Sequence, residues 1–286
     1  ALGRTTHADV GFDGVDGVLH LAAGVTSVRD MANDQEALPQ RVARFDAGTE
    51  IGPRVLMAGF MDGRGPYAGP TKVLVDTPEE AEKWVNWYAD HGYRQIKVYS
   101  SLKRELLPLI ARLAHGRGLR LSGHVPAFMS AEQFVAAGAD EIQHLNFLFL
   151  NFLMKEAPDT RDMTRFSAVG KYADGIDPVG EREKKFIAAL VAGRTVVDPT
   201  INIFENFYDA RPGIVSPGFG EVANRLPPQV RRSLMLGGLQ APRGDEARYG
   251  KALKSMLRFL KAIHLAGVPI LPGTDGLPGF ALQREL

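Results

Sequence analysis

The sequence predicts an α/β fold, built as a TIM (β/α)8-type barrel in which seven of the eight strands are present. Short β-branched or apolar segments alternate with helical segments along almost the whole chain, a pattern typical of a parallel sheet. Polar side chains stand where several of these strands end, as they do at the mouth of a barrel. No GxGxxG motif follows any strand, which disfavours a doubly wound sheet.

Seven segments have the composition of strands, because they are rich in β-branched and apolar residues and are bounded by glycine, proline or polar residues. They are residues 24–31, 53–59, 94–100, 119–125, 140–145, 195–202 and 268–274. Helices are expected between most of these strands. Two of the helices have capping-box starts, in which Thr77 is followed by Glu80 and Ser130 by Gln133.

We expect a single barrel domain over residues 1–286, since 286 residues with 45% hydrophobic content can bury one full core. Two long insertions, at about 147–180 and 204–243, interrupt the alternation after strand ends, where barrels build lids and specificity loops. The second insertion carries the residues of a predicted aromatic lid: Phe204, Phe207, Tyr208 and Arg211.

The composition points to a small-molecule substrate. Lysine and arginine number 34 against 33 acidic residues, and no long basic block occurs, so nucleic acid and anionic membranes are poor partners. Cysteine is absent, so any metal must be held by nitrogen and oxygen ligands. The N-terminus has no secretory signal pattern, and the composition does not fix the compartment.

Lys97 lies inside a predicted strand, where alternation turns Gln95, Lys97 and Tyr99 inward and Ile96 and Val98 outward. A lysine in a barrel interior is costly unless it is paired, neutralised or covalently modified. Its amine could add carbon dioxide and bridge two metals as a carbamate, or form a Schiff base with a carbonyl substrate. A carboxylate partner, or a side chain that reaches the barrel rim, would instead make it structural.

Three further polar residues stand where apolar runs stop. His124 and His144 follow strands of consecutive βα units, and Asp275 follows the last apolar run between glycines. Adjacent parallel strands end side by side, so both histidines can reach one metal ion. Together with Lys97, they predict a metal-hydrolase site at the barrel mouth.

Five segments carry a family resemblance: HLAAGVTSVRDMAND, QIKVYSS, LSGHVP, GADEIQHLN and PGTDG. They resemble the amidohydrolase superfamily, in its imidazolonepropionase-like and prolidase-like branch, and the resemblance covers nearly the whole chain. It implies two metals, usually zinc, at the mouth of a TIM barrel. It also implies that Lys97 is the carboxylated bridging ligand, that His124 and His144 are ligands, and that Asp275 is both a ligand and the proton acceptor.

The sequence departs from that family in one respect. The family's first barrel strand ends in a His-x-His pair, and no His-x-His occurs in this chain. We therefore expect a fragment that lacks the first strand and the small β-domain and stops at FALQREL inside the eighth helix. A variant that uses His7 is the alternative. An open barrel seam would expose strand edges and favour a homo-oligomer.

The expected function is a metal-dependent hydrolase of amide-type C–N bonds in a dipeptide, cyclic amide or carbamate. Two metals would lower the pKa of a bridging water and polarise the substrate carbonyl, Asp275 would move the proton, and Tyr99 would hydrogen-bond the substrate. Two alternatives stay open: a Schiff-base lyase or aldolase that uses Lys97, and an inactive barrel without the first metal site.

Overall fold

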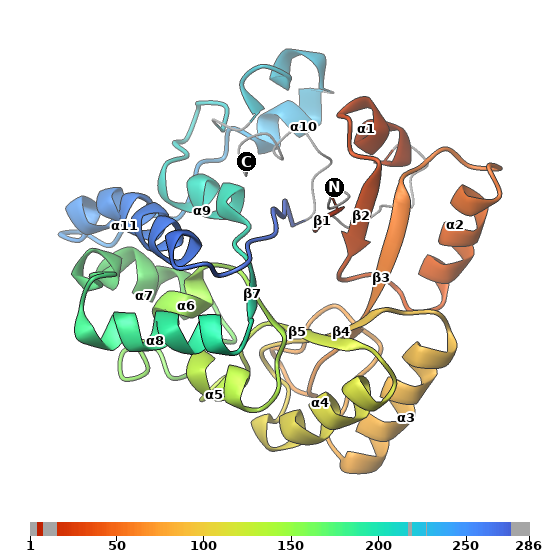
Figure 1. The fold of residues 1–286 in the computed structure, drawn as a ribbon. Helices are drawn as coiled ribbons and strands as arrows, with labels where there is room; N and C mark the ends of the chain where they lie inside the picture. Colours follow the sequence, from red (N-terminus) through yellow and green to blue (C-terminus); the bar gives the residue numbers. More distant parts are fainter. Residues whose placement is uncertain (1–4, 8–15, 217–218, 227, 276–286) are drawn as a thin grey trace.

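In a computed structural model of the chain, the structure describes residues 5–7, 16–216, 219–226 and 228–275. The strands form one parallel sheet in which spatial order follows chain order. They are β1 Thr5–His7, β2 Ser27–Asp30, β3 Arg54–Met61, β4 Gln95–Val98, β5 Arg120–Gly123, β6 Glu141–Gln143 and β7 Val196–Asp198. The sheet curls into a half-barrel, consistent with an incomplete TIM barrel (Figure 1).

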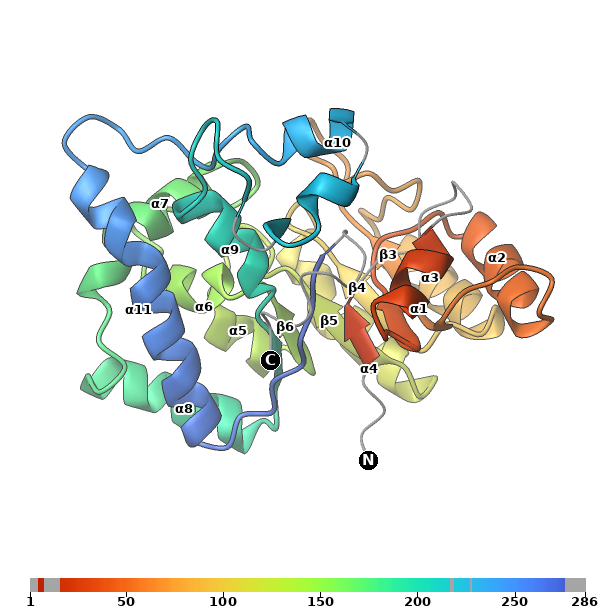
Figure 2. The ribbon, with the colours of Figure 1, turned by 90° about the horizontal axis from the view of Figure 1, so that it is seen from above.

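Helices follow the strands along the chain, and some of them flank the curled sheet. They are α1 Asp16–Ala22, α2 Ala37–Asp46, α3 Pro78–Asp90, α4 Leu107–Gly116, α5 Ala131–Ala136, α6 Asn146–Leu150, α7 Thr164–Tyr172, α8 Glu181–Ala192, α9 Ile201–Tyr208, α10 Pro228–Ser233 and α11 Glu246–Leu265. Figure 2 shows α1, α2 and α3 on one flank of the sheet and α7, α8 and α11 on the other. None of the helices within the described residues is long and apolar enough to cross a membrane.

Six of the seven predicted strands are confirmed, and the predicted strand at 268–274 is wrong. That segment contains isolated bridge residues and no strand: Ile270 forms a parallel bridge to Val197 of β7, and Gly273 is a second isolated bridge residue. Pro269 and Pro272 explain the difference, because neither residue has an N–H to donate to a neighbouring strand. The sequence also predicted no strand before residue 24, whereas Thr5–His7 pairs with β2 as β1.

The predicted helix starts are confirmed. The Thr77 side chain caps α3 by accepting from the Glu80 N–H, and Ser130 and Gln133 form the complete capping box of α5. The Glu80 carboxylate accepts from the Asp76 N–H and pairs with Arg64. The two predicted insertions contain α7 and α10. The predicted eighth-helix segment FALQREL and the side chain of His7 lie outside what the structure describes.

The strand β4 shows the expected alternation. Ile96 and Val98 are fully buried in the hydrophobic core, while Gln95 and Lys97 face the barrel interior, where Gln95 accepts a hydrogen bond from Arg29. Lys97 stands two residues nearer to the carboxyl end of the strand than Gln95. The interior therefore has a lower polar layer and, above it, the layer that carries the candidate site.

Asp62 organises the Gly/Pro-rich loop that follows β3. Its buried carboxylate accepts hydrogen bonds from the backbone N–H groups of Gly63, Gly69 and Ser101, at 2.9, 2.7 and 2.8 Å. Burial raises the pKa of Asp62, and these backbone donors oppose the rise without cancelling it. The carboxylate thus ties the loop, which includes Pro70 at the candidate site, to the end of β4.

We expect Asp62→Asn to lower the free energy of unfolding by about 1–3 kcal/mol, because the amide NH2 cannot accept from a backbone N–H. A raised pKa in the folded state contributes stability that is present at low pH and lost as the pH rises through that value. The stability gap between the wild type and the variant should therefore widen as the pH is lowered. Urea unfolding between pH 7 and pH 4 measures it. If the stability difference between the wild type and Asp62→Asn narrowed as the pH fell, the backbone N–H donors would have a larger effect on the pKa of Asp62 than its burial.

Candidate active site

The predicted site residues meet in one pocket at the carboxyl ends of the strands. This cavity of about 110 Å³ is lined by residues of β3 and β4 and of the segments that follow β2, β3, β4, β5, β6, β7 and Ile270. The lining residues are Ala32, Phe60, Pro70, Lys97, Tyr99, His124, His144, Asn146, Phe147, Arg165, Phe166, Ile203, Phe204 and Asp275. All five residues predicted from the sequence, Lys97, Tyr99, His124, His144 and Asp275, are among them.

His124 is aimed into the pocket by the end of β5. Gly123 has a φ of 136°, and a Cβ there would overlap the carbonyl oxygen of Val98, so only glycine fits. The buried His124 ring has its Nδ1 3.0 Å from the Ser100 hydroxyl. This hydrogen bond fixes the orientation of the imidazole and makes Nε2 the nitrogen that would face a metal.

His144 is held in a similar way on the next strand. Its Nδ1 lies 2.8 Å from the Thr200 hydroxyl, and its ring centroid lies 4.7 Å from that of His124. His144, Thr200 and Asp275 all have positive φ values, of 71°, 43° and 50°. Non-glycine residues rarely adopt this conformation, and such strain tends to cluster at functional sites.

Asp275 faces His144 across the pocket. Its Oδ2 lies 3.9 Å from His144 Nε2, comparable with the roughly 3.4 Å that separates two ligand atoms about a tetrahedral zinc ion. The structure thus brings together two residues that are far apart in the chain. The geometry suits a shared ion as well as a direct contact between the two side chains.

Lys97 is buried to 2% exposure, yet no carboxylate among the described residues lies within ion-pair distance of its Nζ. Its Nζ lies over two aromatic rings, 5.6 Å from the Phe60 centroid and 5.8 Å from the Tyr99 centroid. A purely structural lysine would pair with a carboxylate or extend to the barrel rim. Lys97 does neither, since it has no carboxylate partner within the described part of the chain and its side chain is buried. An isolated buried amine of this kind is costly.

Tyr99 forms part of the wall around these groups. Its ring stacks on His124 with centroids 3.8 Å apart and meets Phe60 edge-on at 5.2 Å. This packing supports the orientation of the imidazole. The predicted hydrogen bond from Tyr99 to a substrate stays a prediction.

The donor set suits a divalent ion with nitrogen and oxygen ligands. Two imidazoles with hydroxyl-anchored Nδ1 atoms, one carboxylate and one amine line the same pocket. Within the described ranges no group of three or more His, Cys, Asp or Glu side chains is positioned to hold a metal. Lys97 therefore matters for the fit, because a carbamate on its amine would add oxygen ligands that the unmodified side chains lack.

The predicted aromatic lid is a wall built from two helices. Phe204 lines the pocket from α9, Phe207 packs on Phe166 of α7 at 4.4 Å, and the Tyr208 hydroxyl donates to the Phe166 carbonyl. Arg211 is exposed and is not a lining residue. The sequence suggested the aromatic character of this segment but not its pairing with α7.

Asn146 and Arg165, the two other polar residues of the pocket, were not predicted from the sequence. Asn146 lies two positions after His144, and that spacing was an available signal. Arg165 lies in the middle of the first insertion, and no sequence pattern sets it apart from the neighbouring Arg161.

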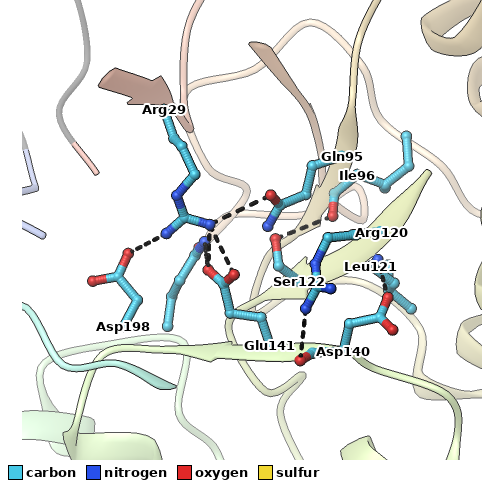
Figure 3. Close-up of polar contacts among 10 residues, drawn as sticks. Arg29, Gln95, Ile96, Arg120, Leu121, Ser122, Asp140, Glu141 and Asp198 are labelled. Atoms are coloured by element: carbon cyan, nitrogen blue, oxygen red, sulfur yellow. Dashed lines mark hydrogen bonds and ion pairs between the residues drawn. The ribbon is translucent and has the colours of Figure 1, made fainter. Parts of the chain in front are cut away.

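A buried ionic network lies in the barrel interior below the site (Figure 3). The Arg29 guanidinium contacts both carboxylate oxygens of Glu141 at 2.8 Å and Asp198 at 2.9 Å. Burial alone would lower the pKa of Arg29, but the two carboxylates raise it overall, so the residue stays charged. The network also reaches the site, because the Asp198 carbonyl accepts from the His144 N–H and Gln143 donates to Glu141.

Comparison with known proteins gives matches in structure alone. No family model and no curated protein sequence matches the chain. Among solved structures it is similar to a bottromycin amidohydrolase (TM-score 0.68, 21% identity, 99% of this chain and 61% of that one). It is also similar to an ochratoxinase of A. niger, with a TM-score of 0.63 and 17% identity over 99% of this chain and 65% of that one. A putative prolidase from Bifidobacterium longum matches with a TM-score of 0.60 and 18% identity over 99% of this chain and 62% of that one.

The chain thus spans less than two thirds of the length of each of these structures. The structural neighbours are members of the amidohydrolase superfamily at low sequence identity. The described part of the chain therefore has the fold of the barrel found in those proteins.

Proposed function

We propose that this chain carries the active site of a metal-dependent hydrolase that cleaves amide-type C–N bonds, in a dipeptide, cyclic amide or carbamate. One observation carries the proposal. Lys97 is buried with no carboxylate partner among the described residues, in the same pocket as two hydroxyl-anchored histidines and Asp275. The similarity to an amidohydrolase, an ochratoxinase and a putative prolidase supports the same reaction class.

The proposed ligands are His124, His144, Asp275 and Lys97, and zinc suits this set of nitrogen and oxygen donors. Lys97 would take part as a carbamate, formed when its neutral amine adds carbon dioxide and releases one proton. When bound, the metal group supplies a water of lowered pKa and polarises the scissile carbonyl.

The remaining steps belong to the side chains. Asp275 would accept the proton of the attacking water and deliver it to the leaving nitrogen, since its carboxylate already faces His144 across the pocket. Tyr99 would orient the substrate carbonyl or carboxylate. Phe166 and Phe204 would exclude water from the apolar side of the pocket.

The test is metal reconstitution of the purified protein with zinc and bicarbonate, followed by elemental analysis and an assay against amide, carbamate and ester substrates. We expect bound zinc and turnover of an amide. Thr200→Val should weaken zinc binding about 10- to 100-fold, because the hydroxyl that orients His144 is gone. Thr200→Ser keeps that hydroxyl and serves as the matched control. A metal content near zero in the wild type would favour an inactive barrel.

A Schiff-base lyase or aldolase is the second candidate, because the buried Lys97 amine without a carboxylate partner among the described residues also suits imine formation. Borohydride reduction in the presence of a small carbonyl substrate separates the two. Covalent trapping at Lys97, lost in Lys97→Met, would support the lyase. Turnover that needs zinc, without trapping, would support the hydrolase.

A further inference from the structure

A second cavity lies at the opposite end of the sheet from the candidate active site. Its volume is about 300 Å³, and it lies at the amino-terminal ends of the strands, where β4, β5, β6 and β7 begin. The lining residues are Arg29, Leu56, Met57, Arg94, Gln95, Arg120, Glu141, Val196 and Leu271. None of these residues lines the pocket at the carboxyl ends of the strands, where barrel enzymes carry out their chemistry. The cavity is therefore separate from the proposed catalytic site.

Two arginines of this cavity have no counter-charge within the described part of the chain. Arg94 directly precedes β4, Arg120 begins β5, and both are exposed. Neither forms an ion pair with a described carboxylate. Arg120 donates to the Asp140 backbone carbonyl at 3.3 Å, while the Asp140 carboxylate pairs with His115 instead. Both guanidinium groups can therefore bind an anion.

The floor of the cavity holds a buried donor without a partner. Gln95 is 6% exposed, and its Oε1 accepts from Arg29 Nη1 at 3.4 Å, a contact that Figure 3 shows as a dashed line. This contact sets the orientation of the amide and leaves Nε2 as the donor. Among the described residues Nε2 has no hydrogen-bond partner, and a buried polar atom without a partner is costly. An acceptor atom of a ligand would satisfy it.

Glu141, the acidic residue of the lining, is already neutralised. Both of its carboxylate oxygens accept from Arg29 at 2.8 Å, and Gln143 donates to Oε1 at 3.1 Å. The charges of Arg94 and Arg120 are therefore not offset by the carboxylate in the cavity. The cavity favours a ligand with a strongly negative group.

The same cavity also exposes apolar side chains. Leu56 stands beside Arg29 in the register of β2 and β3 and is 38% exposed. Val196 and Leu271 are partly exposed residues of the same lining. Covering these side chains would remove apolar surface from water, which is favourable. A ligand that carries an apolar group beside its negative group therefore suits the cavity better than a bare anion.

We propose that this cavity binds a phosphate monoester that carries a small apolar group. A phosphate monoester has close to two negative charges near pH 7, which matches the two unpaired guanidinium groups better than a carboxylate does. Its oxygens would accept hydrogen bonds from Arg94, Arg120 and Gln95 Nε2. The apolar group would lie against Leu56. The site goes beyond the proposed hydrolase function and does not depend on it.

Isothermal titration of the full chain with phenyl phosphate tests the proposal, with zinc withheld so that the phosphate cannot bind a metal in the other pocket. We expect saturable binding to one site. Inorganic phosphate and phenol each offer one half of the ligand, and each should bind at least about tenfold more weakly. Equal affinity for phenyl phosphate and inorganic phosphate would overturn the assignment of the apolar group.

Arg120→Met and Arg94→Met should each weaken the binding of phenyl phosphate about 10- to 100-fold, because each removes a charge-assisted contact. Both side chains are exposed, so both variants should fold, which thermal unfolding checks. Arg120→Lys should have an intermediate affinity, since lysine offers a single point charge. Arg54→Met is the matched control and should bind as the wild type does. Arg54 is exposed and begins β3 at the same edge of the sheet, but it does not line the cavity.

Arg165→Met distinguishes the two pockets, because Arg165 lines the candidate active site and not this cavity. It should leave the affinity for phenyl phosphate unchanged. Affinity that is lost in Arg165→Met, or that survives in both Arg94→Met and Arg120→Met, would place the phosphate elsewhere and overturn the proposal. A wild type that shows no saturable binding would overturn it as well. Neither result bears on zinc-dependent hydrolysis, which is measured separately.

Discussion

Replacing Lys97 with methionine is expected to abolish hydrolysis and, at the same time, to leave the metal-free protein as stable as the wild type or more stable. The loss in kcat/KM should be on the order of 10³-fold or more, as for other residues on which a catalytic group depends. Activity should fall while stability does not, because Lys97 serves the proposed chemistry and its burial destabilises the fold. A residue that serves packing alone would not separate them.

The stability part of this expectation follows from the surroundings of the amine. Lys97 is 2% exposed, its amine lies over the rings of Phe60 and Tyr99, and no carboxylate within the described ranges pairs with it. Methionine is an unbranched apolar side chain that can fill much of the same space. Removing a poorly compensated polar group from such a site should raise the free energy of unfolding by about 1–3 kcal/mol.

The measurement pairs zinc content and kcat/KM with urea unfolding of the metal-free protein. Lys103→Met is the matched control, since that lysine is 55% exposed and pairs only at the surface with Asp76. It should leave activity intact and change stability by no more than about 0.5 kcal/mol. A Lys97→Met protein that loses several kcal/mol would show that the amine has a structural partner.

Arg29→Met is expected to lower the free energy of unfolding by about 3–5 kcal/mol, a larger loss than that expected for Asp62→Asn. Arg29 is the cation that faces both Glu141 and Asp198 in the barrel interior. Without it, two buried carboxylates would face each other with no cation between them. Burial strengthens their repulsion, because the interior screens charge less than water does.

The loss should depend on pH in one direction. Protonation of either carboxyl group relieves the repulsion in the variant, so the variant should be closer to the wild type at pH 5 than at pH 8. Urea unfolding at the two pH values measures the difference. Arg117→Met, which removes a surface pair with Asp90, is the control and should cost less than about 1 kcal/mol at either pH. An equal loss at both pH values would contradict the network.

Glu141→Gln is a milder probe of the same network, because Arg29 keeps Asp198 as a partner. Gln143 donates to Glu141, and the next residue, His144, donates its backbone N–H to the Asp198 carbonyl. We therefore expect both Arg29→Met and Glu141→Gln to disturb the position of the His144 imidazole. The ionic layer thus supports both the closure of the sheet and the position of a proposed ligand.

Local patterns were sufficient to predict most of the fold. Thr77 and Ser130 marked helix starts that the structure confirms, because caps act within one turn of the chain. The alternation of side chains in β4 placed Gln95 and Lys97 inside the barrel, because successive residues of a strand point to opposite faces. The strand predicted at 268–274 was wrong, because the prediction gave more weight to the apolar content of the segment than to its two prolines. The effect of a proline depends on whether its missing N–H would face a neighbouring strand.

Residue patterns within the chain were enough to predict the order of strands and helices and the positions of five polar residues at strand ends, because both follow from short-range periodicity and from the shared direction of parallel strands. These residues are Lys97, Tyr99, His124, His144 and Asp275. The other groups that complete the site could be identified only after the chain had been followed through its fold. The Ser100 and Thr200 hydroxyls contact histidines on other strands, and Arg29 pairs with Glu141 and Asp198, so these contacts join segments from different parts of the chain. Such contacts depend on how the curled sheet brings strand ends and loops together, and no local pattern encodes that closure.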